Sequence, residues 1–291
     1  MPQTAIATLA TPVSLNLPIP AQRAAAKPFI KWAGGKGQLI SKFVPLFPPV
    51  SKVKRYFEPF LGGAALFFYL QHPQAYLSDG NAELIELYQI VRDDVDHLIE
   101  ALKLHRNTED YYYQTRALNP VSLTPIQRAA RFIFLNKTCY NGLYRVNSQG
   151  QFNVPFGRYQ NPAICDAPGL RAASRALNHA QLTVTDFEQA VSAARRHDFI
   201  YFDPPYQPIS KTSSFTAYTS GRFDAAEQQR LAQVYARLAQ RGCYVMLSNS
   251  DAPLIRELYA GFRTTEILAS RAINSKGDGR GKITELLITN Y

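Results

Sequence analysis

The sequence predicts an α/β fold with a doubly wound, mostly parallel sheet and an inserted second domain. Short apolar strands alternate with helical segments in both halves of the chain. In the first half, a glycine pair follows one strand and an acid ends the next, as in half of a doubly wound sheet. The two halves are separated by roughly 90 residues of different texture, whereas a parallel crossover needs only a few tens.

The amino-terminal half contains one strand–turn–helix–strand unit followed by a second helix. Residues 1–26 are rich in Ala, Thr and Pro, and we expect a mobile tail outside the fold. Strands are expected at Arg55–Phe60 and Ala75–Asp79. Leu61–Leu70 reads as a tight turn that opens an apolar helix, and about Ala82–Val91 as an amphipathic helix.

The carboxy-terminal half returns to the same alternation. Strands are expected at Gln181–Asp186, Asp198–Asp203, Cys243–Ser250 and Thr284–Tyr291. A helix over Ala225–Gln240 places Leu231, Val234, Tyr235 and Leu238 on one face and stops at Gly242. We therefore predict one domain from residues 27–92 and 183–291, and a mainly helical inserted domain from residues 93–182 that carries a β-hairpin.

Composition narrows the class of protein. The 291 residues include 46% hydrophobic and 12% aromatic residues, which is typical of a globular protein. The formal charge of +10 favours a polyanion-binding protein, but a merely basic enzyme stays open. Three cysteines and no HExxH pattern give no disulfide framework and no metal signal. With no long apolar run and no secretory signal, we expect a cytoplasmic protein without a membrane segment.

The segment DFIYFDPPYQPIS, residues 198–210, carries the strongest chemical signal. A buried strand delivers Asp203 to its end, and Pro204 and Pro205 then hold the chain extended. The Asp203 carboxylate and the Pro204 carbonyl only accept hydrogen bonds, so together they suit a ligand with two N–H donors on one atom, such as an exocyclic amino group. Tyr206 adds a flat ring for stacking on a heterocycle.

Two glycine-containing stretches are weaker signals. Gly62 and Gly63 allow a sharp turn near a ligand, and Asp79 follows at the distance of a ribose-binding acid. FIKWAGGKGQLI, residues 29–40, fails the phosphate-loop spacing, because Ile30 and Gly37 stand where Gly and Ser or Thr are required. It forms either a capping turn with Trp32 in the core or a clamp on a small cofactor.

Taken together, these stretches resemble the Dam-type (D12 class) DNA adenine-N6 methyltransferases, most of all those that methylate GATC. The resemblance rests on FIKWAGGK, the FLGGA turn, NKTCYNGLYRVNSQGQFNVPFGRYQNP and DPPY, in the family's order, and it extends from about Pro28 to Tyr291. Ala64 departs from the family's FxGxG turn, and we expect a modest effect on cofactor affinity.

The resemblance implies S-adenosyl-L-methionine as the cofactor, a Rossmann-like methyltransferase sheet, and double-stranded DNA as the partner. A flipped-out adenine would then meet Asp203, Pro204, Pro205 and Tyr206 as the catalytic residues. The implied cofactor-binding residues are Trp32, Lys36, Phe60, Gly62, Gly63, Asp79, Asp186, Phe187 and Asp203. No metal is expected.

The inserted domain is expected to bind DNA. Ser148–Gly150 forms a plausible turn, and alternation would place Leu143, Arg145 and Asn147 on one face of the hairpin, where Arg can pair with guanine. An exposed hairpin with a merely solvated Arg is the alternative. The predicted DNA-binding residues of this domain are Tyr140, Asn141, Leu143, Arg145, Asn147, Pro155 and Arg158. Arg271, Lys276 and Arg280 lie in a basic loop that is predicted to contact the DNA backbone. The alternative is that this loop is surface without a function.

Three other functions stay open at this stage. A cytosine-N4 methyltransferase usually has Ser in place of Asp203, and a protein-directed enzyme has an NPPY corner. A noncatalytic DNA-binding relative is disfavoured because Asp203 to Tyr206 and Asp79 are intact. The sequence also leaves open whether a cognate restriction endonuclease acts on the same site.

Overall fold

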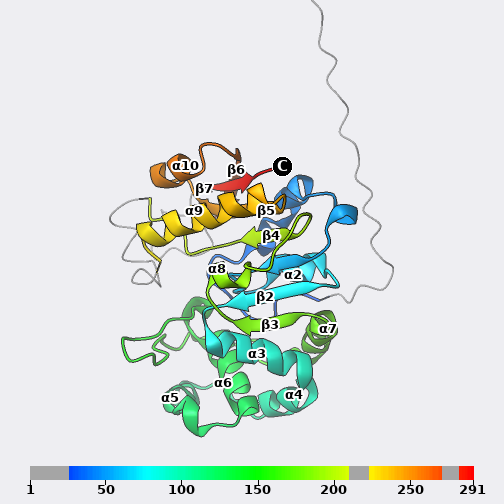
Figure 1. The fold of residues 1–291 in the computed structure, drawn as a ribbon. Helices are drawn as coiled ribbons and strands as arrows, with labels where there is room; N and C mark the ends of the chain where they lie inside the picture. Colours follow the sequence, from blue (N-terminus) through cyan, green and yellow to red (C-terminus); the bar gives the residue numbers. More distant parts are fainter. Residues whose placement is uncertain (1–25, 210–222, 271–281) are drawn as a thin grey trace, which may run out of the picture.

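The computed structural model describes residues 26–209, 223–270 and 282–291. Seven strands form one sheet in the order β3-β2-β1-β4-β5-β7-β6. They are β1 (Tyr56–Glu58), β2 (Ala75–Asp79), β3 (Gln181–Val184), β4 (Phe199–Phe202), β5 (Tyr244–Ser250), β6 (Arg263–Ser270) and β7 (Lys282–Thr289). The first five strands pair in parallel, and β7 is antiparallel to both β5 and β6. The predicted Rossmann-like methyltransferase sheet is confirmed (Figure 1).

Ten α-helices and five short 3-10 helices surround the sheet in the described part of the chain. The α-helices are α1 (Ile40–Phe43), α2 (Ala65–Leu70), α3 (Ala82–Asp93), α4 (Val95–Lys103), α5 (Glu109–Ala117), α6 (Pro125–Thr138), α7 (Ala167–Leu177), α8 (Phe187–Ala190), α9 (Ala225–Gln240) and α10 (Pro253–Leu258). The 3-10 helices are η1 (Lys36–Gln38), η2 (Val44–Leu46), η3 (Val50–Lys52), η4 (Pro120–Ser122) and η5 (Tyr140–Gly142).

Alternating side chains of the central strands fill two separate cores, one on each face of the sheet. Tyr56, Tyr201 and Met246 pack in the core that α2 and α3 share. Their neighbours along the strands, such as Ile200 and Val245, pack against α8, α9 and α10. This two-sided burial explains why the strands read as continuous apolar runs.

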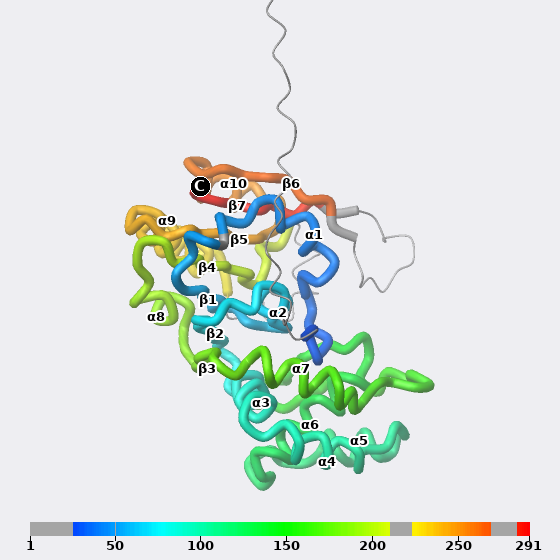
Figure 2. Tube along the Cα trace, turned by 90° about the vertical axis from the view of Figure 1, so that its right-hand side faces the viewer, coloured from blue at the N-terminus to red at the C-terminus, as the bar shows by residue number. Residues whose placement is uncertain are grey.

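The segment between α3 and β3 lies beyond the β3 edge of the sheet, where α4, α5 and α6 gather far from α9 (Figures 1 and 2). Its helices do not have a core entirely of their own, because Leu98 of α4 and Ile133 of α6 belong to the same buried cluster as β2 and α3. A smaller cluster around Tyr112 and Phe134 holds the outer part. The segment is thus fastened to the sheet by a continuous apolar contact.

The topology fixes where a ligand site is expected. β1 lies between β2 and β4, so successive connections leave β1 in opposite directions. Ligands of open α/β sheets bind outside the carboxyl ends of the strands at such a switch point. The glycine turn follows β1, and Asp203 follows β4.

Candidate active site

Asp203 occupies the carboxyl end of β4 and is the centre of a polar cluster. Its Oδ1 atom lies 2.9 Å from the Lys36 Nζ and 2.9 Å from the Ser248 Oγ. Its side chain is 20% exposed, whereas that of Lys36 is only 4% exposed. A buried ammonium group therefore faces a carboxylate that is still accessible from outside.

The corner that follows Asp203 is held by β5 and α9. The Gln207 main-chain N–H donates to Asn249 Oδ1 at 3.1 Å, and the Ser250 hydroxyl donates to the Gln207 carbonyl. Gln228 of α9 donates its Nε2 to the Pro205 carbonyl at 2.9 Å. These bonds fix the backbone after the two prolines.

The Pro204 carbonyl and the second Asp203 oxygen have no hydrogen-bond partner among the described residues. Both belong to one rigid corner, and both are acceptors. The arrangement thus offers two lone-pair acceptors to a donor group.

The Tyr206 side chain is held by a contact at its hydroxyl and a second contact on the face of its ring. Its hydroxyl donates to Glu285 Oε2 of β7 at 2.7 Å, and the Lys36 Nζ lies 4.8 Å from its ring centroid. Burial raises the pKa of Glu285, and burial together with nearby Asp203 raises the pKa of Tyr206 well above its usual value. The ring is therefore a neutral, oriented plane beside Asp203.

The glycine turn after β1 meets the first motif. A Cβ atom on Gly62, whose φ is +48°, would lie 2.7 Å from Trp32 Cδ1, and one on Gly63 would lie 3.2 Å from Trp32 Cβ. Absent side chains thus let the Trp32 indole rest on this turn, while Lys36, four residues on, reaches Asp203. The structure brings both glycine-containing stretches together at the carboxyl ends of the central strands.

Asp79 ties the turn to β2. Its Oδ2 accepts from the Gly62 N–H at 3.1 Å and its Oδ1 from the Asn81 N–H at 2.9 Å. Burial raises the pKa of Asp79, and the main-chain donors oppose this rise. Each carboxylate oxygen keeps a lone pair, so the group can still accept hydrogen bonds from ligand hydroxyls.

Asp186 caps the amino-terminus of α8, and Phe187 is the first residue of this helix. Phe187 is stacked on Phe60 with 5.4 Å between ring centroids, and the Arg230 guanidinium lies 4.0 Å from the Phe187 centroid. Arg230 also bonds Asp186 and thereby lowers the pKa of that carboxyl. The predicted residues lie together, but Phe187 is only 4% exposed.

Glu58, at the end of β1, is a buried carboxyl that the sequence analysis did not single out. It accepts hydrogen bonds from the Tyr56 hydroxyl at 2.8 Å and the Phe67 N–H at 3.1 Å. Burial raises its pKa to about 8, and the charge of Asp203 acts in the same direction. The sequence does carry a signal for Glu58, because an acidic residue follows apolar residues within a predicted strand.

The segment between α3 and β3 contacts the first motif directly. The Asn136 side chain exchanges two hydrogen bonds with the main chain of Lys31, at 2.8 and 2.7 Å. Trp32 stacks on Tyr144 with 5.6 Å between centroids, and Tyr144 stacks in turn on Phe132 at 5.2 Å. The hairpin base and the Trp32 side chain therefore form one packed unit.

The predicted DNA-binding residues differ in exposure. Those that lie on the surface are Tyr140, Asn141, Arg145, Pro155 and Arg158, and Asn147 is half-buried. Tyr140 and Pro155 are neighbours, because the Tyr140 N–H donates to the Pro155 carbonyl at 2.9 Å. Arg271, Lys276 and Arg280 lie outside the described residues.

The predicted alternation of the hairpin is wrong at Leu143. Its side chain is 4% exposed and packs in the cluster of Tyr112 and Phe134, so it does not share an exposed face with Arg145. The physical reason is that the arms are not regular strands: they are joined by isolated bridges, such as Val146 to Phe152. Leu143 is therefore buried here, whereas Arg145 is exposed.

Comparison with known proteins identifies the family. A family model described as D12 class N6 adenine-specific DNA methyltransferase matches residues 32–273. The chain belongs to the D12 class of N6 adenine-specific DNA methyltransferases. The predicted enzyme class is thereby confirmed, and the match favours adenine over the cytosine-N4 alternative.

Several named relatives are similar over almost their whole length. A type II methyltransferase of Lactococcus lactis subsp. cremoris is 44% identical over 273 residues, covering 91% of this chain and 95% of the relative. A type II methyltransferase of Methanocaldococcus jannaschii is 44% identical over 286 residues, covering 91% and 99%. The DNA adenine methylase of Escherichia coli K12 is 36% identical over 263 residues, covering 89% and 93%.

The D12 chain has one unusual backbone position in its glycine turn. Ala64, where the resemblance leads one to expect Gly, has a φ of +54° and is 1% exposed. A left-handed conformation costs a non-glycine residue roughly 1–2 kcal/mol. The Ala64 N–H donates to the Leu61 carbonyl at 2.7 Å, so the turn keeps its shape despite this cost.

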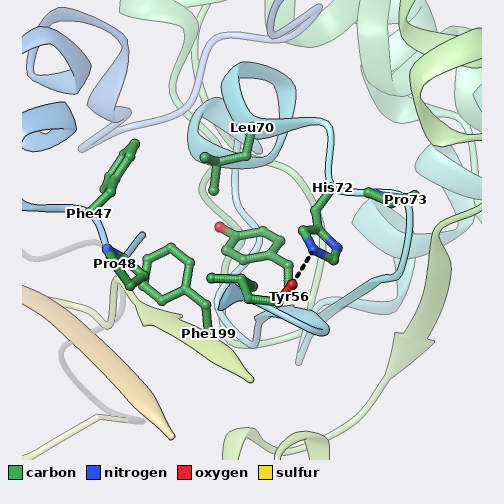
Figure 3. Close-up of a pocket in the computed structure, with 8 residues that line it drawn as sticks. Phe47, Pro48, Tyr56, Leu70, His72, Pro73 and Phe199 are labelled. Carbon is green, nitrogen blue, oxygen red and sulfur yellow. Dashed lines mark hydrogen bonds between the residues drawn. The ribbon is translucent and has the colours of Figure 1, made fainter. Parts of the chain in front are cut away.

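A separate cavity of about 240 Å³ lies at the opposite ends of the strands from the Asp203 cluster. Tyr56 and Phe199, the first residues of β1 and β4, line it together with Phe47, Leu70 and His72 (Figure 3). Its lining is mainly apolar and has no part in the Asp203 cluster. Within the described ranges, no group of three metal-binding side chains and no helix able to cross a membrane is found.

Proposed function

We propose that this enzyme transfers the methyl group of S-adenosyl-L-methionine to N6 of a flipped-out adenine in duplex DNA, within GATC. The observation that carries the proposal is the rigid corner at Asp203, with its unpartnered carboxylate oxygen and the unpartnered Pro204 carbonyl in the described structure. An amino group with two N–H donors satisfies both acceptors. Adenine N6 is such a group.

The two acceptors address a chemical difficulty. The N6 lone pair is delocalised into the purine ring, so the nitrogen is a poor nucleophile. Hydrogen bonds from both N6 protons to Asp203 and Pro204 favour a pyramidal nitrogen and stabilise the positive charge that develops on it. The lone pair forms the new N–C bond, the sulfonium sulfur keeps the electrons of the broken C–S bond, and N6 then releases one proton.

The residues around the glycine turn suit a nucleoside-containing methyl donor. When bound, S-adenosyl-L-methionine supplies an activated methyl group. We assign the ribose hydroxyls of the cofactor to Asp79 and its adenine ring to Asp186 and Phe187. The remaining contacts to the cofactor are assigned to Trp32, Lys36 and the turn from Phe60 to Gly63. Support comes from the acceptor lone pairs of Asp79 and from the placement of all these residues at one sheet edge.

An adenine in a stacked duplex cannot reach this corner, so the proposal includes extrusion of the base from the helix. The oriented Tyr206 ring would stack on the extruded adenine. Residues 93–182 would act as the target-recognition domain, with Arg145 paired to a guanine edge. The GATC target follows from the resemblance described above, and relatives named DNA adenine methylase share 34–36% identity with this chain.

Methyl transfer to defined duplexes tests the proposal. With tritium-labelled S-adenosyl-L-methionine, we expect incorporation into a GATC duplex and none into a matched duplex in which the adenine is replaced by guanine. Asp203→Ala should abolish transfer and keep DNA binding measurable. Near-normal turnover by Asp203→Ala would refute the mechanism, and equal labelling of both duplexes would refute the adenine target.

Two relatives carry the name type II methyltransferase. This supports, as part of the proposal, a cognate restriction endonuclease that recognises the same site. Methylation of that site can be tested in cells: DNA from cells expressing this chain should resist cleavage by an endonuclease that adenine methylation at GATC blocks. Full cleavage of such DNA would contradict methylation at GATC.

A further inference from the structure

Two buried hydroxyl groups lie behind Asp203: that of Tyr201, in the strand that leads to Asp203, and that of Ser248, which lies outside the sequence motifs discussed above. Ser248 of β5 is 0% exposed, and Tyr201 of β4 is 1% exposed. The Ser248 Oγ lies 2.9 Å from the Asp203 Oδ1 and 2.9 Å from the Tyr201 hydroxyl. The three side chains form a linear chain of hydrogen bonds that starts in the core and ends at the site.

The strand register explains why they meet. Tyr201 pairs with Met246 and Phe202 with Leu247 in the β4–β5 ladder, so the next position along brings Asp203 opposite Ser248. Tyr201 and Asp203 are two residues apart and therefore point to the same side of the sheet. A polar pair at this depth costs free energy unless its groups are hydrogen-bonded to each other.

The chemistry of the groups fixes the direction of the chain. A carboxylate only accepts, so the Ser248 O–H donates to Asp203. The Ser248 oxygen then accepts the Tyr201 O–H. Together with Lys36, the serine places two donors on Oδ1 alone, which leaves Oδ2 without a partner among the described residues.

We infer that Ser248, supported by Tyr201, is a positioning residue that locks the rotation of the Asp203 carboxylate and presents Oδ2 to the substrate amino group. The terminal torsion of an aspartate is intrinsically broad, so it needs such partners to be held. Misplacement of a reacting group by about 1 Å can lower a rate by about 100-fold. This inference rests on the proposed function and adds to it which oxygen acts and what orients it.

Kinetics of hydroxyl-deletion variants test the inference in the full-length protein. We expect Ser248→Ala to lower kcat by roughly 10- to 100-fold, with KM for DNA and for S-adenosyl-L-methionine within about 3-fold. Tyr201→Phe should lower kcat less. Because Tyr201 acts through Ser248, the double variant should be no slower than Ser248→Ala alone.

Tyr235→Phe is a matched control. Tyr235 is also fully buried and donates its hydroxyl to a main-chain carbonyl, that of Val245, at 3.1 Å, but it has no contact with Asp203. Removal of the Tyr235 hydroxyl should lower the melting temperature of the protein and leave kcat unchanged. If Ser248→Ala keeps wild-type kcat, or if Tyr235→Phe lowers kcat as much as Tyr201→Phe does, the inference is overturned.

A structural readout separates this inference from the proposed function. Crystal structures of the wild type and Ser248→Ala should show one Asp203 carboxylate orientation in the former and a rotated or mixed orientation in the latter. An inactive wild-type protein with this structural difference would refute the proposed function only. An active wild type whose Asp203 keeps its orientation in Ser248→Ala would refute the positioning role only.

Discussion

Because Gly62 has no side chain, the Trp32 indole of the first motif can pack against the glycine turn. The residue has a φ of +48°, a conformation that side-chain-bearing residues rarely adopt, and the Trp32 indole fills the space where a Cβ would lie. The Gly62 N–H also donates to Asp79. One residue thus connects the tryptophan of the first motif to the proposed ribose-binding acid.

Gly62→Ala should therefore damage the proposed cofactor site. We expect a loss of roughly 1–2 kcal/mol in the free energy of unfolding from backbone strain, and a further cost as Trp32 moves. Binding of S-adenosyl-L-methionine, measured by calorimetry, should weaken by about 10-fold or more, equivalent to roughly 1.4 kcal/mol. Gly37→Ala is the control, since its Cβ would meet no atom within 4 Å. Equal effects of both variants would contradict the explanation.

Glu58 predicts a dependence of stability on pH. Its pKa of about 8 in the folded protein is raised from 4.5 by burial, so the folded state holds a proton that the unfolded state has lost between these values. The free energy of unfolding should fall as pH rises from about 4.5 to about 8, by up to roughly 1.4 kcal/mol per pH unit from this group. Below this window the contribution is fully favourable.

Glu58→Gln keeps the shape of the side chain and removes the titration. Denaturant unfolding between pH 5 and 8 should then show a flatter profile than that of the wild type. Glu257→Gln, on the exposed surface of α10, serves as the control and should leave the profile unchanged. An unaltered slope in Glu58→Gln would show that other groups cause the dependence.

At the scale of elements, the sequence predicts buried and well-capped segments best. β2 and α9 have the predicted bounds, because β2 lies inside the sheet and α9 begins at an Asp224 cap and ends before Gly242. β6 was not predicted: it is an edge strand whose Arg263, Thr264 and Glu266 are exposed, so it lacks an apolar run. Edge strands carry little of the burial pattern on which such predictions depend.

The candidate site shows the same division. Asp203, Lys36, Trp32, Gly62 and Asp79 were predicted, and the structure places them at one edge of the sheet. Their partners Ser248 and Glu285 were not, because each reaches the site through the register of another strand. Leu143 was misplaced because periodicity fails where the hairpin has only isolated bridges.

The contact between Trp32 and Tyr144 joins the first motif to the hairpin that we propose to recognise DNA. Tyr144→Ala removes the ring that stacks on Trp32 and Phe132, and aromatic pairs contribute roughly 0.5–1.5 kcal/mol each beyond burial. We expect weaker binding of both S-adenosyl-L-methionine and duplex DNA, each by about 3- to 10-fold. Tyr144→Phe keeps the ring, loses the hydroxyl that donates to Glu83, and should bind both ligands nearly normally. Loss of DNA binding alone would show that the stack does not connect the two sites.

At the scale of the whole molecule, the formal charge of +10 should make binding to a polyanion such as DNA depend on salt concentration. Cations that neutralise phosphates release counterions, so the logarithm of the binding constant falls with the logarithm of salt concentration by about 0.9 per contact. Such contacts position the protein on any duplex, whereas contacts to base edges distinguish sequences. The exposed Arg145 and Arg158, both predicted to bind DNA, allow these two roles to be separated.

Arg158→Ala should reduce the salt slope by about 0.9 and weaken binding equally on duplexes with and without GATC. Arg145→Ala should instead reduce the preference for GATC, because a bidentate pair with guanine contributes roughly 1–3 kcal/mol of discrimination. Arg171→Ala is the control: this arginine of α7 is paired with Asp96 and lies outside the hairpin, so the slope should not change. Fluorescence anisotropy from low to moderate salt measures all three variants. An unchanged slope in Arg158→Ala would remove that residue from the phosphate contacts, and uniform weakening by Arg145→Ala would make it one of them.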